Sequence, residues 1–538
     1  MKRKIVGIFI MILLIGTTIP VIRTISNEIV IKQNYDNETD NLGYQTSLNG
    51  VILDQVLDEN NKGYSVISVW GTHYEMGYAQ AELLGDYIVQ AVKENIDFAG
   101  NDYNQIRELM SEAVWIPQVI EDEFDGMVDS LAITHPLENI DDLDLKALNT
   151  LGDWSYGFAC RSHSCWGRYV SEPIKTLSTR RLDFQSPYSS ANHIVLCARD
   201  PDDGSGKWLN LAFPGYLLVA TCVNEYGTLV SSHDYNSYDT DFSQDCMPRM
   251  VAYRYAATYT PNSDISTHLT DVYNELQNYE MMVGGFLNYY TPEGYGGVMT
   301  FNPLQTGADF YDLRISQENW HHGEAIITTN QWTDGTYTPS DEDFGADSYY
   351  NDESPKTLDT HWDLLHYEGV GGRGMHQLSL AYRGAEDMTI WADGKISSSQ
   401  NTPRLEYEWS DLFFEPPIMN EIDGLTSGKA GDEHEYIFSA TDPDGDDVTY
   451  VIDWGDDTGE EEFGPYPSGE EQTFSHTWSE KDTYTIRSMA KDIHGAESDW
   501  IELEVSMSKT KITVSPFITF LENHPHLFTL IRLIFGLK

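Results

Sequence analysis

Basic residues are scarce in this chain of 538 residues. It has 32 Lys and Arg residues against 86 Asp and Glu residues, which gives a formal net charge of −54 at pH 7. A nucleic-acid-binding surface needs clustered cations to neutralise phosphates, so this imbalance excludes DNA and RNA as partners. A strongly negative surface is typical of a protein that stays soluble in a salty or extracellular setting. We therefore interpret the acidity as a property of solvation.

Motifs for metal or serine chemistry are also missing. No two of the five cysteines stand in a Cys-x-x-Cys spacing, which argues against a structural zinc site. His321, His322 and Glu324 are metal-ligand types, but no HExxH helix contains them. A Gly-x-Ser-x-Gly nucleophile elbow is absent as well. We expect no metal and no cofactor. The odd number of cysteines leaves one thiol over, and the other four would allow two disulfides.

The N-terminus has the composition of a targeting segment. Residues 2–4 are Lys-Arg-Lys, and an apolar run follows over residues 5–22. A basic start before such a run predicts either a cleaved export signal or a retained membrane anchor within residues 1–25, and both remain open. In either case the body of the protein is expected to be extracellular or at the cell surface. Residues 26–49 are polar and read as a linker.

Hydrophobic periodicity predicts a mixed α+β domain over residues 50–414. Hydrophobic residues make up 40% of the chain and aromatic residues 12%, enough for a substantial core. Helical periodicity covers residues 74–98 and 103–131, with an interruption at Pro117. Short strands and turns follow Cys160. Further helices are expected at residues 248–259 and 265–280. Strands are expected at residues 194–197, 208–211, 217–220, 297–301, 324–329, 377–382 and 388–392.

Residues 415–507 read as a separate all-β, immunoglobulin-like sandwich, because short strands alternate with Asp/Gly turns after the Glu-Pro-Pro at 415–417. Four motifs carry a resemblance: Asp442-Pro443-Asp444-Gly445, Trp454-Gly455-Asp456, Tyr484-Thr485-Ile486 and Asp492-x-x-Gly495. The segment resembles the PKD (polycystic kidney disease) domain of surface proteins, which implies spacing or adhesion.

The acidic turn at 442–447 and the C-terminal tail each allow more than one interpretation. Asp442, Asp444, Asp446 and Asp447 are ligand types for calcium, but the EF-hand spacing and its closing Glu are absent, so turn formation is the favoured interpretation. In the tail, residues 508–538, the terminal apolar stretch is too short to span a bilayer. It would lie on a membrane, dock on a partner or pack back onto the protein.

Cys160 is the candidate nucleophile. A thiol needs a nearby base and positive charge to react as thiolate, and Arg180 and Asp183 follow on the next predicted strand. On composition alone, a structural cysteine beside an ordinary Arg–Asp ion pair is the stronger interpretation. What favours chemistry is a series of motifs in a fixed order. They are Gly71-Thr72-His73-Tyr74-Glu75-Met76-Gly77, Glu123-Phe124-Asp125-Gly126, Cys160 with Trp166-Gly167, Arg180-x-x-Asp183, Asn224-Glu225-Tyr226-Gly227 and Thr328-Thr329-Asn330.

In this order the motifs resemble the Cys-type N-terminal-nucleophile (Ntn) hydrolases of the isopenicillin-N acyltransferase-like family, over about residues 50–412. The resemblance implies a four-layer αββα domain with a pro-segment at residues 50–159. The precursor would cleave its own chain between Ala159 and Cys160 and so separate this pro-segment. The freed α-amino group would serve as base for its own thiol, which forms a thioester with an amide substrate. By the same resemblance, Asp183 would hold the α-amino group and Arg180 would support the thiolate. Asn224 and Asn330 would line the oxyanion site.

The expected activity is hydrolysis or acyl transfer at a C–N amide bond of a small-molecule substrate. The chain departs from the family in having Ala159 before the Cys and Arg161 after it. Cys165 is a rival nucleophile, but Cys160 is favoured because Trp166-Gly167 lies six residues downstream of it, as in close relatives. Two alternative functions remain: a non-catalytic surface adhesion or scaffold protein with a degenerate Ntn fold, and a phospholipase B-like secreted hydrolase.

Overall fold

The computed structural model describes residues 46–47, 49–57, 62–112, 114–154, 158–184, 193–234, 246–258, 264–301, 311–315, 323–329, 346–366, 374–397, 400–508, 519–520 and 523–527. The predicted N-terminal signal or anchor, Asn330, and most of the C-terminal tail lie outside these residues. By internal contacts the chain divides into two units, residues 1–413 and residues 414–538. Within the described residues, no helix is both long enough and apolar enough to cross a membrane.

The helices of the first unit begin and end where local sequence signals place them. α1 starts after a capping box in which the Thr72 hydroxyl accepts from the Glu75 N–H and the Glu75 carboxylate accepts from the Thr72 N–H. Pro117 is the N-cap of α3, which confirms the predicted interruption. The helices are α1 (His73–Ala99), α2 (Tyr103–Glu112), α3 (Gln118–Thr134), α4 (Asp142–Asn149), α5 (Leu151–Trp154), α6 (Arg249–Thr258), α7 (Ile265–Leu276), α8 (Ala346–Asn351) and α9 (Leu358–His366). Short 3₁₀ turns are η1 (Gly100–Asp102), η2 (Gly167–Tyr169), η4 (Pro292–Gly294) and η5 (Trp409–Asp411).

A ten-stranded sheet runs in the order β1-β2-β3-β6-β7-β8-β9-β10-β11-β12. β3 and β6 pair in parallel, and the other neighbours pair antiparallel. The strands are β1 (Thr46–Ser47), β2 (Gly50–Leu57), β3 (Gly63–Gly71), β6 (His193–Pro201), β7 (Trp208–Ala212), β8 (Thr221–Asn224), β9 (Leu229–Asp234), β10 (Gly285–Tyr290), β11 (Gly297–Phe301) and β12 (Tyr311–Ile315). The parallel β3–β6 pair joins the predicted pro-segment to the chain that follows Cys160.

A seven-stranded sheet contains the predicted nucleophile strand near one edge. Its order is β13-β4-β5-β14-β15-β16, with β17 also paired to β15, and all pairs are antiparallel. The strands are β4 (Phe158–Trp166), β5 (Thr176–Phe184), β13 (Ala325–Thr329), β14 (Gly374–Gly384), β15 (Asp387–Ser397), β16 (Gln400–Asn401) and β17 (Leu405–Glu408). The register on β4 sets which residues face the nucleophile.

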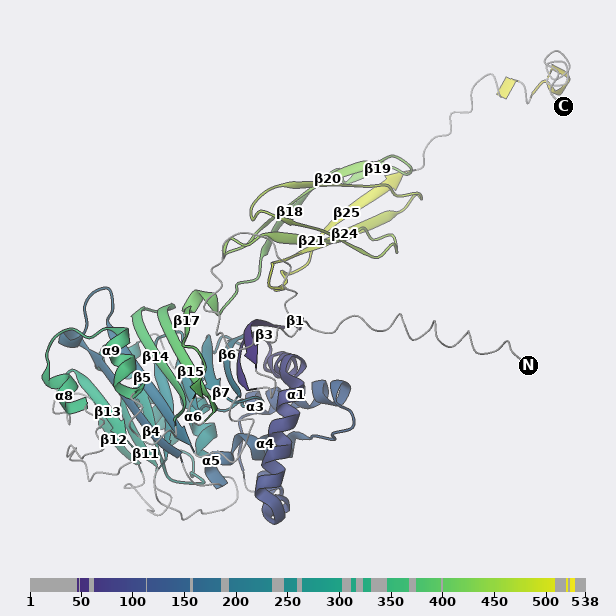
Figure 1. The fold of residues 1–538 in the computed structure, drawn as a ribbon. Helices are drawn as coiled ribbons and strands as arrows, with labels where there is room; N and C mark the ends of the chain where they lie inside the picture. The colour runs from purple at the N-terminus through teal and green to yellow at the C-terminus, as the bar shows by residue number, and fades with distance from the viewer. Residues whose placement is uncertain are drawn as a thin grey trace, which may run out of the picture. The chain divides into compact units, whose positions relative to one another are not determined.

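Three apolar clusters show how helices and sheets pack in the first unit. One joins α1, α3, α6 and α7 to one face of the ten-stranded sheet, with Phe124 and Val251 fully buried in it. A second contains side chains of both sheets, among them Leu196 and Leu378. The third joins the seven-stranded sheet to α8 and α9 around Trp362. Figure 1 shows α1, α3 and α4 on one side of the sheets and α8 and α9 on the other.

Two glycines allow α1 and α3 to cross at close range. A Cβ on Gly77 would stand 2.0 Å from the Glu123 carbonyl oxygen, and one on Gly126 would stand 2.0 Å from the Tyr74 carbonyl oxygen. Both clashes are with backbone, which a rotamer change cannot relieve. Gly77 and Gly126 belong to the first two motifs of the predicted family pattern, so packing alone explains why glycine stands at these two positions.

The predicted strand at residues 217–220 is wrong. This segment is a buried connection between β7 and β8, and side chains form the hydrogen bonds to the backbone of Leu217 and Leu218. The side-chain Oδ1 of Asn149 accepts from the N–H groups of Leu217 and Leu218 at 2.6 and 3.1 Å. The Leu217 carbonyl accepts from Arg254 at 2.8 Å. A short apolar run has the same sequence pattern whether its partners are a strand or polar side chains.

The second unit is a β-sandwich, as predicted. One sheet has the order β18-β20-β23 and the other β19-β25-β24-β21-β22. Trp454 and Trp478 are buried between them, and the Trp478 indole N–H donates to the Trp454 carbonyl at 3.1 Å. The strands are β18 (Ile418–Gly424), β19 (Ser427–Lys429), β20 (His434–Thr441), β21 (Val448–Asp453), β22 (Glu460–Tyr466), β23 (Gln472–His476), β24 (Thr483–Lys491) and β25 (Ile501–Ser508).

Candidate active site

β4 separates its alternate residues into two environments. Cys160, Ser162 and Ser164 share one face, because side chains alternate along a strand. The Ser162 hydroxyl lies 2.7 Å from His233 Nε2, a residue of β9 in the other sheet, so this face looks into the space between the sheets. His163 and Cys165 share the opposite face, toward α8 and α9.

Arg180 brings a positive charge to the Cys160 thiol. Its Nη2 lies 3.2 Å from Cys160 Sγ and donates to the Ser232 carbonyl at 2.9 Å. Cys160 is 3% exposed and Arg180 is 0% exposed, so water screens the interaction little. A guanidinium in direct contact with sulfur favours the thiolate form. The family resemblance implied a supporting role for Arg180 at the thiolate, and the structure brings the two side chains into contact.

The second guanidinium nitrogen of Arg180 contacts a histidine. Arg180 Nη1 donates to His376 Nε2 at 3.2 Å, and the Thr221 hydroxyl lies 3.1 Å from the same ring nitrogen. Burial and the Arg180 charge hold the pKa of His376 well below its ordinary value, so the ring is neutral. Arg180 therefore bridges Cys160 and a neutral imidazole.

Cys165, the rival nucleophile, lies in a different environment. It is 0% exposed and packs in the apolar cluster of α8 and α9. Burial raises the pKa of the Cys165 thiol to about 12, against weaker lowering by Tyr350 and Lys356. Its Sγ lies 3.9 Å from Nδ1 of His361, and burial keeps the pKa of His361 well below its ordinary value. The site disfavours a thiolate, which argues for Cys160.

The register of β4 and β5 places Asp183 directly opposite Ala159, and Leu182 opposite Cys160. The predicted scissile bond joins Ala159 to Cys160, so it lies directly opposite Asp183 and Leu182. For Ala159 and Asp183 the structure describes only the backbone. The predicted role of Asp183 therefore rests on its position opposite Ala159. All five cysteines are described, and none forms a disulfide, in contrast to the two bridges that the odd count allowed.

Asn224 does not lie where an oxyanion donor for Cys160 would have to be, which corrects the sequence prediction. Its amide donates to the Ala257 carbonyl of α6 at 3.2 Å, on the helix-covered face of the ten-stranded sheet. Its Oδ1 accepts from the N–H groups of Tyr226 and Thr228 at 3.2 and 3.1 Å. Asn224 thus closes the turn between β8 and β9, a common role for Asn. Asn330, the other predicted oxyanion residue, lies outside the described residues.

The sequence prediction missed the polar residues that face Cys160 and Ser162 from other strands. Besides His233 and His376, these include Asn288 on β10, whose amide nitrogen lies 3.1 Å from Ser231 Oγ and 3.4 Å from Ser162 Oγ. One signal was present in the sequence. Asn288 shares one face of β10 with Phe286 and Tyr290, so a polar residue occurs on an otherwise aromatic, buried face. No such local signal marked His376.

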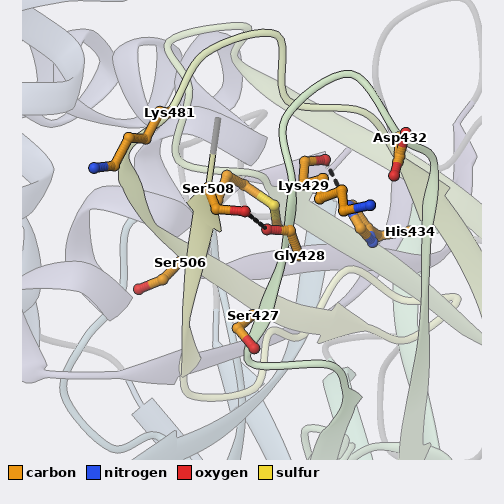
Figure 2. Close-up of a pocket in the computed structure, with 9 residues that line it drawn as sticks. Ser427, Gly428, Lys429, Asp432, His434, Lys481, Ser506 and Ser508 are labelled. Carbon is orange, nitrogen blue, oxygen red and sulfur yellow. Dashed lines mark hydrogen bonds between the residues drawn. The ribbon is translucent and has the colours of Figure 1, made fainter. Parts of the chain in front are cut away.

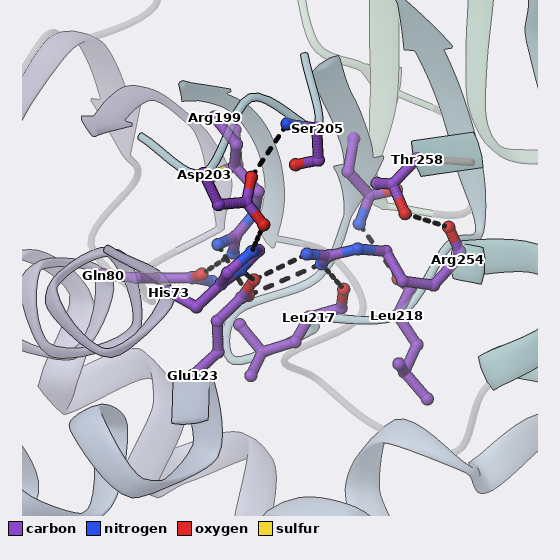
Figure 3. Close-up of polar contacts among 12 residues, drawn as sticks. His73, Gln80, Glu123, Arg199, Asp203, Ser205, Leu217, Leu218, Arg254 and Thr258 are labelled. Atoms are coloured by element: carbon purple, nitrogen blue, oxygen red, sulfur yellow. Dashed lines mark hydrogen bonds and ion pairs between the residues drawn. The ribbon is translucent and has the colours of Figure 1, made fainter. Parts of the chain in front are cut away.

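A buried charge cluster holds the predicted pro-segment to the rest of the first unit. Glu123 on α3 is 0% exposed, and its Oε1 accepts from Arg254 Nη2 at 2.6 Å. Its Oε2 accepts from Arg199 Nη1 at 3.0 Å. Arg254 also lies over the Trp208 ring, 3.9 Å from its centre. Figure 3 shows both guanidinium groups converging on the carboxylate.

His73 and Asp203 complete this cluster. His73 Nδ1 lies 2.8 Å from Glu123 Oε1, and His73 Nε2 lies 3.2 Å from Asp203 Oδ2. Burial is the largest single influence and lowers the pKa of His73, but the contacts with Glu123 and Asp203 together raise it, and the net change is upward. Burial would raise the pKa of Glu123, but Arg254 and Arg199 lower it to about 2. His73 and Glu123 come from two of the pro-segment motifs, so their contacts in this cluster give these two motif residues a structural role.

In the second unit, the acidic turn at residues 442–446 packs beside the turn that follows β24. Asp442 Oδ1 accepts from the N–H groups of Asp444 and Asp446, both at 3.0 Å, the turn-forming role that the sequence favoured. Asp492 Oδ1 does the same for His494 and Ala496, both at 2.8 Å. Among the residues that the structure describes, no group of three or more His, Cys, Asp or Glu is arranged to hold a metal ion.

We expect Asp492→Asn to stabilise the second unit at neutral pH. Burial, with repulsion from Asp442, raises the pKa of Asp492 to about 6 against its backbone hydrogen bonds, from an ordinary value of 3.8. A raised pKa adds stability below pH 4 that is lost as the pH rises through 6. Asn keeps the accepting oxygen without the charge, for a gain on the order of 2 kcal/mol at pH 7.

Calorimetry of the full-length chain at pH 4.5 and 7.5 would measure this effect. Asp457→Asn is the matched control, because Asp457 is exposed and its positive φ suits Asn as well as Asp. An identical loss of stability between the two pH values in Asp492→Asn and in the unaltered chain would contradict the prediction.

A shallow hollow lies on the second unit beside β19 and β25. Its lining includes Lys429, Lys481, Asp432 and His434. Figure 2 shows the Ser508 hydroxyl donating to the Gly428 carbonyl, at 3.0 Å, along this lining. In that view the Lys429 and Lys481 side chains point to different sides of the hollow and do not converge. The hollow gives no defined ligand geometry.

Comparison with known proteins identifies one segment. A family model described as the PKD domain matches residues 426–505. A solved PKD domain of an M14-like peptidase from a Thermoplasmatales archaeon is 52% identical and covers 18% of this chain and 100% of its own, with a TM-score of 0.17. A CARDB domain from Pyrococcus furiosus is 14% identical and covers 18% of this chain and 98% of its own, with a TM-score of 0.15. No curated protein matches the chain.

Proposed function

Residues 426–505 of this chain are a PKD domain, and we propose that the first unit, which precedes that domain in the chain, is an exported Cys-type Ntn hydrolase. The enzyme would cleave itself between Ala159 and Cys160 and then hydrolyse, or transfer the acyl group of, a C–N amide. One observation carries the proposal: the Arg180 guanidinium lies 3.2 Å from the Cys160 sulfur in a buried site.

The packing of the first unit supports the proposal. Its apolar clusters join helices to the ten-stranded sheet, the two sheets to each other, and the seven-stranded sheet to helices, which agrees with the four-layer αββα arrangement that we propose. Cys160 lies on the face of β4 that looks into the space between the sheets. The pro-segment contributes β2, β3 and Glu123 to the folded unit, so the two fragments would remain associated after cleavage.

The proposed chemistry uses the α-amino group that cleavage would free at Cys160. With a pKa of about 8 in solution, this amine takes the proton of the Cys160 thiol. The sulfur attacks the amide carbonyl carbon, the C–N bond breaks, and the amine product leaves with that proton. Water then adds to the thioester, the C–S bond breaks, and the acid is released as the proton returns to sulfur. Arg180 stabilises the thiolate at the first step.

Intact-mass measurement of the purified full-length chain tests the self-cleavage. We expect two fragments, with the second beginning at Cys160. A chain that stays intact through prolonged incubation would instead favour the competing function, a non-catalytic surface protein. The PKD domain supports that competitor, because such domains imply spacing or adhesion. A second fragment beginning at Cys165 would move the nucleophile.

A further inference from the structure

Resting on the proposed function, we propose that His376 is a positioning residue that fixes the Arg180 guanidinium against the Cys160 sulfur. Arg180 and His376 are 0% and 2% exposed, so surrounding residues restrict the conformations of both side chains. Arg180 Nη2 is held near the sulfur by its contacts with Ser232, and Nη1 is held by His376.

Strand register places His376 in line with the nucleophile. Leu182 on β5 pairs with Cys160 on one side and with His376 of β14 on the other. Directly paired residues in antiparallel strands point to the same face, so Cys160, Leu182 and His376 form one row across three strands. Arg180 lies two residues along β5 from this row and on its face. The guanidinium of Arg180 therefore reaches both neighbouring strands, with Nη2 at Cys160 of β4 and Nη1 at His376 of β14.

The hydrogen-bond pattern requires one form of the His376 ring. Arg180 Nη1 has only hydrogens to offer, so His376 Nε2 accepts at 3.2 Å. The Thr221 hydroxyl, 3.1 Å from the same nitrogen, must then also donate. The ring proton resides on Nδ1, which is buried and has no hydrogen-bond partner among the described residues. A neutral ring with this tautomer is an acceptor matched to a guanidinium.

The other described titratable group near this row is His233 of β9, which contacts Ser162 rather than Arg180. Asp183 of β5 and Asp234 of β9 are described by backbone alone. His376 Nε2 accepts from Nη1, the guanidinium nitrogen that does not contact the sulfur, at 3.2 Å. Without it, Nη1 would lose its acceptor in a buried site, and the guanidinium would turn toward other acceptors.

The test is the pH dependence of Cys160 alkylation by iodoacetamide in the full-length chain, followed by peptide mass spectrometry. In His376→Leu we expect the midpoint of the rate profile to rise by about one pH unit, with about a tenfold slower reaction at pH 7. His376→Gln should stay close to the unaltered chain, because the Gln side-chain oxygen reaches the position of Nε2. His361→Leu is the matched control: His361 is equally buried but lies beside Cys165.

An unchanged midpoint in folded His376→Leu, with Cys160 reactive in the unaltered chain, would overturn this inference and leave the proposed function standing. Cys160 that resists alkylation in the unaltered chain up to pH 10, with no cleavage, would overturn both. Should His376→Leu fail to fold, His376→Asn replaces it, because the shorter amide falls short of Arg180 and should give the same rise in midpoint. A merely structural role would lower thermal stability in every variant and leave the midpoint in place.

Discussion

Cys160→Ala is expected to leave the chain uncleaved and to lose at least about a thousandfold in reaction with an amide or β-lactam acylating probe. The reason is that the variant lacks the Cys160 sulfur, which attacks the carbonyl carbon both in self-cleavage and in acylation by the probe. Arg180 would keep its contacts with Ser232 and His376. The loss should therefore appear without a large change in folding. Intact mass and covalent labelling measure it directly.

Two companion variants make the result specific. Cys165→Ala should retain cleavage and labelling, because Cys165 packs against α8 and α9 and its pKa of about 12 keeps it protonated. Its cost should be confined to stability, on the order of 1–2 kcal/mol for lost packing. Cys160→Ser should cleave slowly, since a hydroxyl is a weaker nucleophile. Equal labelling of Cys160→Ala and the unaltered chain would exclude Cys160 as the reactive thiol.

Glu123→Gln is expected to destabilise the first unit by about 3–5 kcal/mol, because it removes one charge and leaves two buried guanidinium groups without an anion. Arg199 and Arg254 are 0% and 1% exposed and contact the Glu123 carboxylate at 3.0 and 2.6 Å. Urea unfolding of the full-length chain measures the change. Glu112→Gln, on the exposed surface of α2, is the control and should stay within about 0.5 kcal/mol.

The same carboxylate predicts a pH dependence. Because the pKa of Glu123 is lowered from 4.5 to about 2, its contribution is complete above pH 4.5 and is lost as the pH falls toward 2. Glu123→Gln should lose this acid sensitivity together with its stability at neutral pH. If self-cleavage occurs, the variant should also release the pro-segment at lower urea than the unaltered chain. An unaltered urea midpoint in Glu123→Gln would show that Asp203 and water balance the two arginines.

Local motifs predicted the elements that depend on local backbone geometry. Pro117 marked the start of α3 as its N-cap, because proline lacks an N–H and fits the N-terminus of a helix. The Asp442 and Asp492 turns, with the Trp454-Gly455-Asp456 motif, predicted the PKD domain, which the family model confirms over residues 426–505. The strand prediction failed at residues 217–220, where Asn149 and Arg254 replace a strand partner.

The difference between Cys160 and Cys165 shows where sequence reasoning stops. They are five positions apart, so on one strand they must point to opposite faces, and this follows from the sequence once a strand is assumed. Which face looks between the sheets and which looks toward helices depends on packing. Asn224 was misassigned for the same reason, since its motif gives a turn but not the face of the sheet to which the amide points.

The amino-acid sequence by itself determined the acidic net charge, several of the helices and strands, and the PKD domain, because these follow from composition and from neighbours a few residues apart. Only the tertiary structure decided that Arg180 contacts Cys160 and His376, and that Glu123 contacts Arg199 and Arg254. These contacts join residues from 20 to 196 positions apart. Their geometry depends on strand register and on how two sheets and their helices stack, which no short segment encodes.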